Sequence, residues 1–274
     1  MTFAPTHLPA DLADALAGVR PRLGRLGVPV LYFTSVGSTN DVASALAANG
    51  QREGAVVIAD AQTAGRGRRG RSWFSPPASG LYVSLVLDPG RARIDPDRAT
   101  VLLTVAAGLA IAEGVEAATG LRADIKWPND LVVDRRKLAG VLAEGVAAAG
   151  DARVSSVVLG YGVNVGPMAY PRELSDRATS LESELGRPID RTTVCAETLA
   201  AIARRYDDLI EGQFDAILHA WCDRAPASRG TRITWQTPSG PQSGITGGID
   251  HHGALLVRVG GRVERLVAGE VNWL

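Results

Sequence analysis

Cysteine and histidine are scarce in this 274-residue chain, and its formal net charge is zero. The only cysteines, Cys195 and Cys222, are too few for a disulfide scaffold and lack the spacing of a metal site, which indicates a reducing compartment. Basic and acidic residues number 29 each, which disfavours a protein that binds nucleic acid or an anionic membrane over its whole surface. The four histidines, His7, His219, His251 and His252, lie in the N-terminal segment, a helical segment and the C-terminal strands, and no nucleophile with a base emerges, so a Ser/His/Asp or Cys/His mechanism is unsupported.

Long apolar runs and targeting segments are also lacking. The most apolar stretch, residues 101–112, is shorter than the ~20 residues that a membrane span needs. The first residues contain no basic segment ahead of an apolar one. We therefore expect a cytoplasmic protein with no membrane partner. At ~150 residues per domain, the length predicts one large domain or a main domain with a small one.

Lysine is nearly absent, although arginine is common. Of the 29 basic residues, 27 are arginine, and the two lysines, Lys126 and Lys137, lie 11 positions apart. A compact ammonium group does not replace a planar guanidinium group in every site, so a position that needs a point charge against an oxyanion would keep lysine. Chance placement of two remaining lysines is the alternative interpretation.

Hydrophobic periodicity predicts an α+β fold with a mixed or antiparallel sheet flanked by helices. Short turns between the β segments of residues 122–164 favour antiparallel neighbours there. After residue 226 the pattern changes to short alternating strands, which predicts a small antiparallel barrel. We expect a short N-terminal helical extension, a main domain and a C-terminal domain, at residues 1–27, 28–225 and 226–274.

The strongest local anomaly is QTAGRGRRGR, residues 62–71. Its part from residue 65 to residue 71, here called the Gly/Arg loop, contains three glycines and four arginines. Glycines allow close backbone approach and arginines supply forked donors, so an anionic small ligand is favoured. A solvated turn or a nucleic-acid patch remains open, but the loop matches neither a P-loop nor a dinucleotide fingerprint. Because this charge density repels itself, we expect the free loop to be mobile.

Two further segments place polar groups at element ends. In SVGSTND, Ser38, Thr39 and Asn40 lie where a helix begins, so they could bind polar atoms of a ligand or simply cap the helix. In KWPNDLVVDRRKLAG, both lysines flank a Pro-Asn-Asp turn, and Gly140 follows the second lysine. The turn alone is ordinary hairpin chemistry.

In this order, GSTN, QTAGRGRRGRSWFSP, KWPNDL, KLAGVLAE and LGYGVNV resemble the catalytic domain of the biotin–protein ligases. The tail, with GITGGIDHHGALLVRV and VAGEV, is similar to the small SH3-like C-terminal domain of that family. The match runs from about Ser35 to Glu270, and five ordered motifs are more specific than any one of them. The resemblance implies a class II synthetase-like catalytic domain. Family members with an N-terminal DNA-binding domain exist, but only about 27 residues precede the first strand here, so we expect the monofunctional type and no DNA partner.

The implied reaction has two steps. Biotin and MgATP form biotinoyl-5′-AMP, and a lysine of a biotin carboxyl carrier protein, a subunit of acetyl-CoA carboxylase or another biotin-dependent carboxylase, then displaces AMP. The resemblance implies Lys137 and Arg68 as catalytic residues. It implies biotin contacts at Ser38, Thr39, Asn40, Gln62, Gly65, Arg66, Gly67, Arg68, Lys137, Gly140 and Gly160. It implies nucleotide, phosphate or Mg²⁺ contacts at Arg69, Arg71, Trp73, Lys126, Asn129 and Asn164, with Asn164 nearest Mg²⁺.

The adenine is expected under residues 166–179, where the match is loose and individual residues stay unassigned. No covalent enzyme intermediate is needed, because a reaction between a carboxylate and a triphosphate is limited by repulsion and orientation. Three alternatives stay open. They are a lipoate or octanoate ligase or transferase of the same fold, a nucleic-acid-binding regulator, and a non-catalytic biotin sensor.

Overall fold

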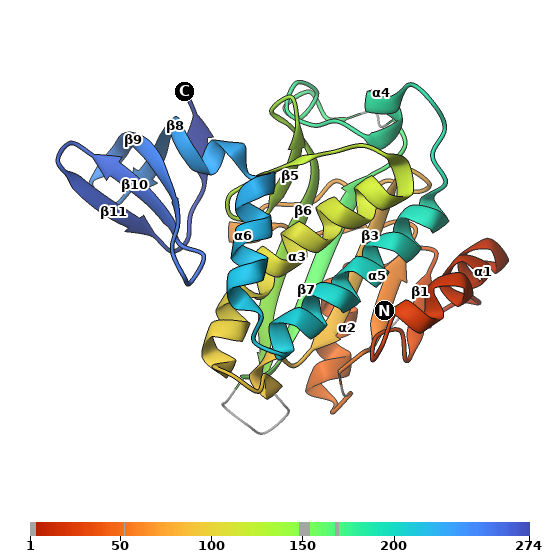
Figure 1. Ribbon diagram of the computed structural model, residues 1–274. Helices are drawn as coiled ribbons and strands as arrows, with labels where there is room; N and C mark the ends of the chain where they lie inside the picture. The colour runs from red at the N-terminus through yellow and green to blue at the C-terminus, as the bar shows by residue number, and fades with distance from the viewer. Residues whose placement is uncertain (1–3, 52, 148–153, 168–169) are drawn as a thin grey trace.

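A seven-stranded mixed sheet forms the centre of the main domain in the computed structural model, which describes residues 4–51, 53–147, 154–167 and 170–274 (Figure 1). Its strand order is β1-β2-β3-β7-β6-β5-β4. Among the described strands of this sheet, β1 and β2 pair in parallel and all other neighbours pair antiparallel. The bounds are Val30–Phe33 for β1, Val56–Ala59 for β2, Gly80–Leu87 for β3, Asp124–Lys126 for β4, Asp130–Val133 for β5, Arg136–Ala147 for β6 and Val154–Asn164 for β7.

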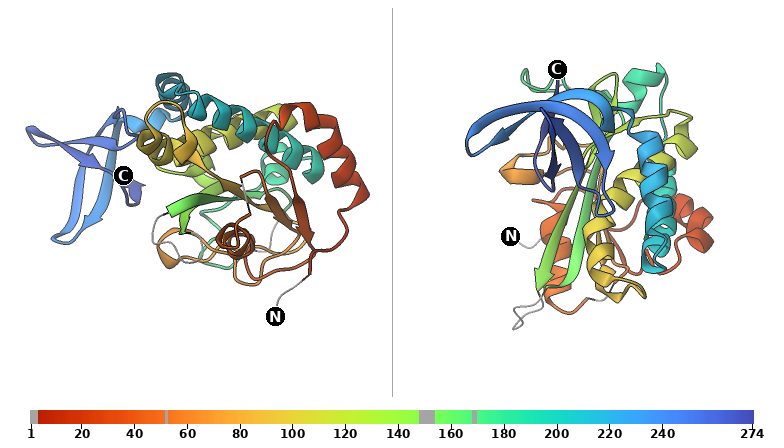
Figure 2. Two further views of the ribbon diagram at one scale, coloured as in Figure 1. Left: turned by 90° about the horizontal axis from the view of Figure 1, so that it is seen from below. Right: turned by 60° about the vertical axis from the view of Figure 1, so that its left-hand side comes forward.

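Helices cover both faces of this sheet, which confirms the predicted fold class. The views of Figures 1 and 2 show α1, α3, α5 and α6 on one face and α2 on the other. The bounds are Ala10–Val19 for α1, Thr39–Ala48 for α2, Pro96–Thr119 for α3, Leu181–Leu185 for α4, Arg191–Ile210 for α5 and Phe214–Arg224 for α6. Short 3₁₀ turns are η1 Arg20–Arg22, η2 Arg68–Gly70, η3 Pro89–Arg91 and η4 Pro226–Ser228.

Helix α3 is longer than its most apolar stretch suggests. The side chain of Asp95 accepts a hydrogen bond from the Arg98 backbone N–H, Pro96 occupies the first turn, and Gly120 ends the helix with a left-handed conformation. By length and composition its 24 residues could cross a membrane, but 67% of its most apolar window is buried inside the protein. This burial, against the sheet and α5, is that of a core helix.

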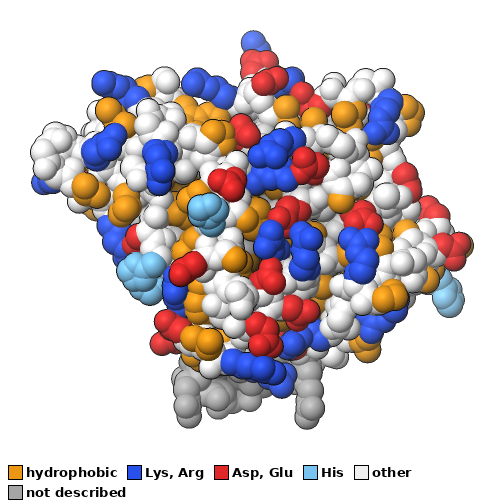
Figure 3. All heavy atoms as spheres, viewed as in Figure 1, with side chains coloured by type: hydrophobic (Ala, Val, Ile, Leu, Met, Phe, Trp, Pro, Cys, Tyr) orange, Lys and Arg blue, Asp and Glu red, His pale blue; other side chains and the backbone are white. Residues whose placement is uncertain are grey.

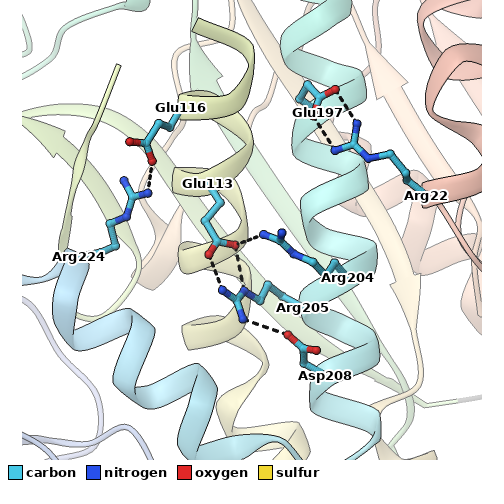
Figure 4. A network of polar contacts seen from close by, with 8 residues as sticks. All are labelled: Arg22, Glu113, Glu116, Glu197, Arg204, Arg205, Asp208 and Arg224. Atoms are coloured by element: carbon cyan, nitrogen blue, oxygen red, sulfur yellow. Dashed lines mark hydrogen bonds and ion pairs between the residues drawn. The ribbon is translucent and has the colours of Figure 1, made fainter. Parts of the chain in front are cut away.

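Ion pairs join the helices of the outer layer (Figure 4). Glu113 of α3 binds Arg204 and Arg205 of α5, and Arg205 also contacts Asp208. Two further pairs tie α3 to α6 and η1 to α5, namely Glu116–Arg224 and Arg22–Glu197. Acidic and basic side chains are interspersed across the face seen in Figure 3, so this face carries no continuous patch of one sign.

The C-terminal residues form a second sheet that packs against the rest of the protein. Its strands are β8 Arg229–Thr237, β9 Gly240–Ile249, β10 Leu255–Val259, β11 Arg262–Leu266 and β12 Val271–Trp273, in the antiparallel order β11-β10-β9-β8-β12. Buried residues of this sheet, among them Ile233, Leu255 and Val271, belong to the same apolar cluster as the main core. The Trp127 indole N–H also donates to the Gly253 carbonyl at 2.9 Å.

Candidate active site

A cleft of about 620 Å³ opens on the α2 face of the main sheet. All predicted ligand residues line it except Gly65. Gly65 lies in the wall behind, where its carbonyl accepts a 2.8 Å hydrogen bond from the Trp73 backbone N–H. A Cβ at Gly65 would lie 2.5 Å from the Trp73 carbonyl oxygen, so the loop can fold back here only with glycine. The structure therefore brings together residues that lie up to 126 positions apart in the chain, from Ser38 to Asn164.

Glycines at paired strand positions leave the floor of the cleft free of side chains from β6 and β7. Gly140 of β6 pairs with Gly162 of β7, and Ser84 of β3 pairs with Gly160 of β7. A Cβ at Gly160 would overlap the side-chain amide of Asn40, and one at Gly162 would overlap the indole of Trp73. Glycine at these positions lets side chains from α2 and from the segment after the Gly/Arg loop lie flat on the sheet.

The beginning of α2 supplies polar groups at one end of the cleft. Ser38 occupies the N-cap position with extended backbone angles, but its hydroxyl makes no capping hydrogen bond. The side chains of Asp95 and Asp190, by contrast, do cap α3 and α5. The interpretation of Ser38 as a cap residue alone therefore has no capping hydrogen bond to support it, and the buried Ser38 lines the cleft.

Gln62 links this helix to the segment that leads into the Gly/Arg loop. Its side-chain oxygen accepts hydrogen bonds from Thr39, at 2.9 Å from the backbone N–H and 3.2 Å from the hydroxyl. Its amide N–H₂ donates to the Ser75 hydroxyl at 2.9 Å. The Ser84 hydroxyl lies 2.8 Å from that of Thr39. This network holds the predicted biotin contacts in fixed orientations.

Three of the four arginines in the Gly/Arg loop have partners outside the loop. Arg66 contacts Asp41 and Glu144, Arg68 donates to Asn129, and Arg71 pairs with Glu270. The fourth, Arg69, has a left-handed backbone conformation with φ of 59°. The expectation of a loop dominated by its own repulsion overlooked these acceptors, which come from α2, β6, the turn before β5 and the C-terminal sheet.

Arg68 reaches furthest into the protein among these side chains. Its guanidinium donates to the Asn129 side-chain oxygen at 3.0 Å, and Asn129 in turn donates to the Val141 carbonyl. Burial lowers the pKa of Arg68, although the charge of Asp130 opposes that shift. A bound anion would stabilise this half-buried cation, which fits a role against phosphate.

Lys137 lies at the centre of the cleft. Its Nζ is 2.7 Å from Asp130 Oδ1 and 5.1 Å from the centre of the Trp73 ring. Its backbone N–H donates to the Arg177 carbonyl at 2.7 Å. The Lys137 carbonyl accepts from the Thr179 N–H at 2.9 Å, so both backbone polar groups of Lys137 are hydrogen-bonded to this segment.

Lys126, the other lysine, lies beside the C-terminal sheet. Burial lowers its pKa, while the charges of Asp130 and Glu270 raise it. Its Nζ is 5.0 Å from the centre of the Trp273 ring. The hydrogen bond from Arg71 lowers the pKa of Glu270, which is therefore a carboxylate near neutral pH. The C-terminal sheet thus supplies both an acid and an aromatic ring to the cleft.

The segment expected over the adenine does lie at the cleft, with residues 168–169 outside the described part. Tyr170, Leu174 and Arg177 line it. The Tyr170 hydroxyl donates to the Thr179 carbonyl at 3.0 Å, and its ring lies 6.5 Å from that of Phe74. Burial raises the pKa of Tyr170 to about 12, so its hydroxyl stays protonated. Two aromatic rings at this edge suit a flat base.

Asn164 joins the same segment to the sheet. Its amide nitrogen donates to the Thr179 carbonyl at 2.9 Å and lies 3.4 Å from the Lys137 carbonyl. Among the described residues, no three acids or histidines are grouped as a metal site. Asp130 and Glu270, both in the cleft, are paired with Lys137 and Arg71. This donor set suits a cation held chiefly by a ligand's own oxygens.

Sequence reasoning missed four residues that line the cleft, Asp130, Tyr170, Glu270 and Trp273, and also Glu144, which bonds the lining residues Asn40 and Arg66. The sequence did contain a signal for Glu144. It follows Gly140 by four positions on a strand, so its side chain lies on the same face of the sheet as the predicted ligand residue Gly140. Asp130 carried another, since it adjoins Asn129 in the same turn. Glu270 and Trp273 carried none, because only tertiary packing brings the C-terminal sheet to the cleft.

Comparison with known proteins adds independent evidence. Residues 32–164 match the model of the biotin/lipoate A/B protein ligase family. The bifunctional ligase/repressor BirA of Bacillus subtilis is 37% identical over 249 residues, which cover 90% of this chain and 74% of that protein. The biotin–[acetyl-CoA-carboxylase] ligase of Mycobacterium tuberculosis is 34% identical over 268 residues, which cover 95% of this chain and 93% of that protein.

The fold comparison agrees with the sequence comparison. The biotin protein ligase from Aquifex aeolicus, solved in complex with biotin and ATP, superposes with a TM-score of 0.76 and 27% identity. The superposition covers 89% of this chain and 98% of that one. The chain belongs to the biotin/lipoate A/B protein ligase family, and its relatives place it among the biotin protein ligases.

Proposed function

We propose that this protein is an ATP-dependent biotin–protein ligase, which makes biotinoyl-5′-AMP and transfers the biotinyl group to a lysine of a biotin carrier protein. One observation carries the proposal. Nearly every residue that the family resemblance assigns to biotin or nucleotide lines a single cleft, which combines the polar groups at the beginning of α2 with several cations. The relatives from Mycobacterium tuberculosis and Aquifex aeolicus are named as biotin ligases, which makes the lipoate or octanoate alternative the weaker one.

In the first step, a biotin carboxylate oxygen forms a bond to the α-phosphorus of ATP, and the bond to pyrophosphate breaks. Both reactants are anionic, so the cleft must offset their repulsion and align them. Lys137 is proposed to lie between the carboxylate and the α-phosphate as a point charge, with Asp130 holding its Nζ before the ligands arrive. Arg68 is proposed to contact the phosphate and to retain the product.

Mg²⁺ is proposed to accompany ATP. Asn164 would be the protein group nearest to it, and the acids of the cleft are already engaged, so the phosphate oxygens and water would supply most ligands. When bound, the ion would neutralise phosphate charge. The nucleotide contacts proposed for the protein itself are Arg69, Arg71, Trp73, Lys126 and Asn129.

In the second step, the neutral ε-amine of a carrier lysine attacks the acyl carbon, and AMP leaves. The proposed acceptor is the carrier domain of acetyl-CoA carboxylase or another biotin-dependent carboxylase. We place the reaction in the cytoplasm, where the free thiols of Cys195 and Cys222 would stay reduced. The Gly/Arg loop is proposed to shield the mixed anhydride from water between the two steps.

The test is biotin-dependent exchange of labelled pyrophosphate into ATP by the purified protein. Exchange with biotin, and none with lipoate or octanoate, is the expected result. Exchange only with lipoate or octanoate would replace the proposed substrate. Biotin binding without any exchange would indicate a sensor. Transfer is then measured by adding a biotin carrier domain and following its mass, with a carrier whose acceptor lysine is replaced by arginine as the control.

A further inference from the structure

One carboxylate joins the floor of the cleft to the Gly/Arg loop. Glu144 lies on β6, opposite Val158 of β7. Its Oε2 accepts a 2.7 Å hydrogen bond from the Asn40 amide nitrogen and a 2.8 Å one from an Arg66 guanidinium nitrogen. Asn40 stands at the beginning of α2 and Arg66 stands in the loop, so these two elements share one oxygen atom.

On the floor side, the carboxylate determines which way the Asn40 amide points. The Asn40 side-chain oxygen lies 2.6 Å from the Ser84 hydroxyl, and its amide nitrogen faces Glu144. A flipped amide would place its oxygen against the carboxylate, and two acceptors repel. Gly160 leaves room for this amide and Asn40 is 4% exposed, so the group has little freedom once both ends are bonded.

On the loop side, Glu144 is one of two anchors. Arg66 also lies 3.0 Å from Asp41, whose side chain is 59% exposed, whereas that of Glu144 is 32% exposed. The more exposed pair is screened by water, so the contact with Glu144 is the stronger anchor. Asp41 therefore holds the loop only weakly, and among the described residues the side-chain amide of Asn40 bonds Glu144 and Ser84 rather than the Asp41 carboxylate.

We propose that Glu144 is a positioning residue that couples the orientation of Asn40 to the closed position of the Gly/Arg loop. This proposal rests on the proposed ligase function. The same negative charge aligns the amide at the biotin end of the cleft and anchors the loop that retains the adenylate. Loss of the charge therefore weakens biotin binding and retention of the intermediate together, although Glu144 need not touch either ligand.

Glu144→Ala and Glu144→Gln test the coupling, and Asp41→Asn is the matched control because it removes the other acid on Arg66 alone. For Glu144→Ala we expect KM for biotin to rise roughly tenfold with a smaller change in kcat, and biotinoyl-5′-AMP to dissociate several-fold faster. Glu144→Gln keeps an acceptor oxygen of the same shape, so it should show both effects to a smaller degree. Asp41→Asn should change neither quantity by more than about twofold, the size expected of an exposed ion pair.

Each outcome decides the proposal. Effects of Glu144→Ala that are no larger than those of Asp41→Asn, or a change in biotin KM without a change in adenylate release, would overturn it. If Glu144→Ala fails to fold by circular dichroism, the isosteric Glu144→Gln decides in the same way. Hydrogen exchange of residues 65–71 should also be faster in the Glu144 variants than in Asp41→Asn. Absence of pyrophosphate exchange in the unmodified protein would contradict the ligase function itself, which is a separate result.

Discussion

At the scale of single residues, the cleft distinguishes lysine from arginine. The chain contains 27 arginines, yet the cation at its centre is Lys137. Lys137 stands 2.7 Å from Asp130 and packs near Trp73 and Gly140, whose Cβ position would be 3.1 Å from Nζ. A guanidinium is wider than an ammonium and needs a planar space, so this position is restricted by shape as well as by charge.

Lys137→Arg is therefore expected to lower the rate of adenylate formation by about 100-fold or more, equivalent to ~3 kcal/mol of transition-state stabilisation. Pyrophosphate exchange at saturating biotin and ATP measures the change. Arg262→Lys, an exposed cation exchange on β11, is the control for preparation and folding. Exchange within twofold of the unmodified rate would show that charge alone matters at this position.

Arg68→Gly is expected to release biotinoyl-5′-AMP at least tenfold faster, because the side chain that reaches Asn129 and the cleft is lost. Released adenylate should then label lysines of a bystander protein such as serum albumin. Thermal stability should change little at a loop position. The prediction fails if the adenylate dissociation rate is unchanged and labelling stays confined to the carrier domain.

At the scale of elements, α3 and α5 are held by burial and by a charged cluster at their outer edge. Glu113 forms ion pairs with both Arg204 and Arg205, and its side chain is 18% exposed. Burial alone would raise the pKa of Glu113, but hydrogen bonds and attraction from the two arginines outweigh it and lower the pKa. The charged form therefore stabilises the folded protein.

Glu113→Gln should lower the free energy of unfolding by about 2 kcal/mol at pH 7, as expected for a half-buried charged hydrogen bond. A lowered pKa in the folded state means that this contribution is complete above the ordinary glutamate pKa of about 4.3 and is lost as pH falls below it. Urea unfolding measures the free energy of unfolding of the unmodified protein and of Glu113→Gln. The difference between the two proteins should therefore be smaller at pH 3.5 than at pH 7.

The control for this change is Glu211→Gln. Glu211 pairs with Arg93 at 3.2 Å, but the two side chains are 48% and 75% exposed. Water screens such a pair, so the substitution should change stability by less than ~0.5 kcal/mol at either pH. Equal losses for Glu113→Gln and Glu211→Gln would contradict the special role of the buried cluster.

At the scale of the whole molecule, the C-terminal sheet is part of the same core and the same site. Its apolar residues join the main cluster, and its residues Glu270 and Trp273 face the cleft. The hydrogen bond from Trp127 to the Gly253 carbonyl ties the two parts near the lysine-bearing strands. We therefore expect both parts to unfold in one transition.

Trp127→Phe should lower stability by about 2 kcal/mol, because it leaves the Gly253 carbonyl without its donor as well as reducing packing. Trp221→Phe is the matched control, since the Trp221 indole N–H is buried without a partner in the described structure. Only Trp127→Phe should accelerate hydrogen exchange in the C-terminal sheet. Equal exchange of that sheet in both variants would show that the hydrogen bond does not join the two parts.

Local sequence determined the element types and most of the candidate site. Helix and strand periodicity depends on which residues alternate along the chain, so the element types follow from the local pattern. The predicted mixed sheet flanked by helices is confirmed. Each family motif is a local strand end, loop or helix start, so it can be recognised from the sequence alone, and residues of these motifs line the cleft.

Tertiary structure alone decided the partners of those residues. The strand register that places Ser84 against Gly160 depends on pairing between β3 and β7, which are far apart in sequence, and no local pattern states it. Docking of the C-terminal sheet decided that Glu270 meets Arg71 across 199 positions. Charge density within the Gly/Arg loop predicted repulsion, whereas the acids that relieve it come from other elements. Long-range packing sets which charges are neighbours, and it therefore decides how the site's cations are held.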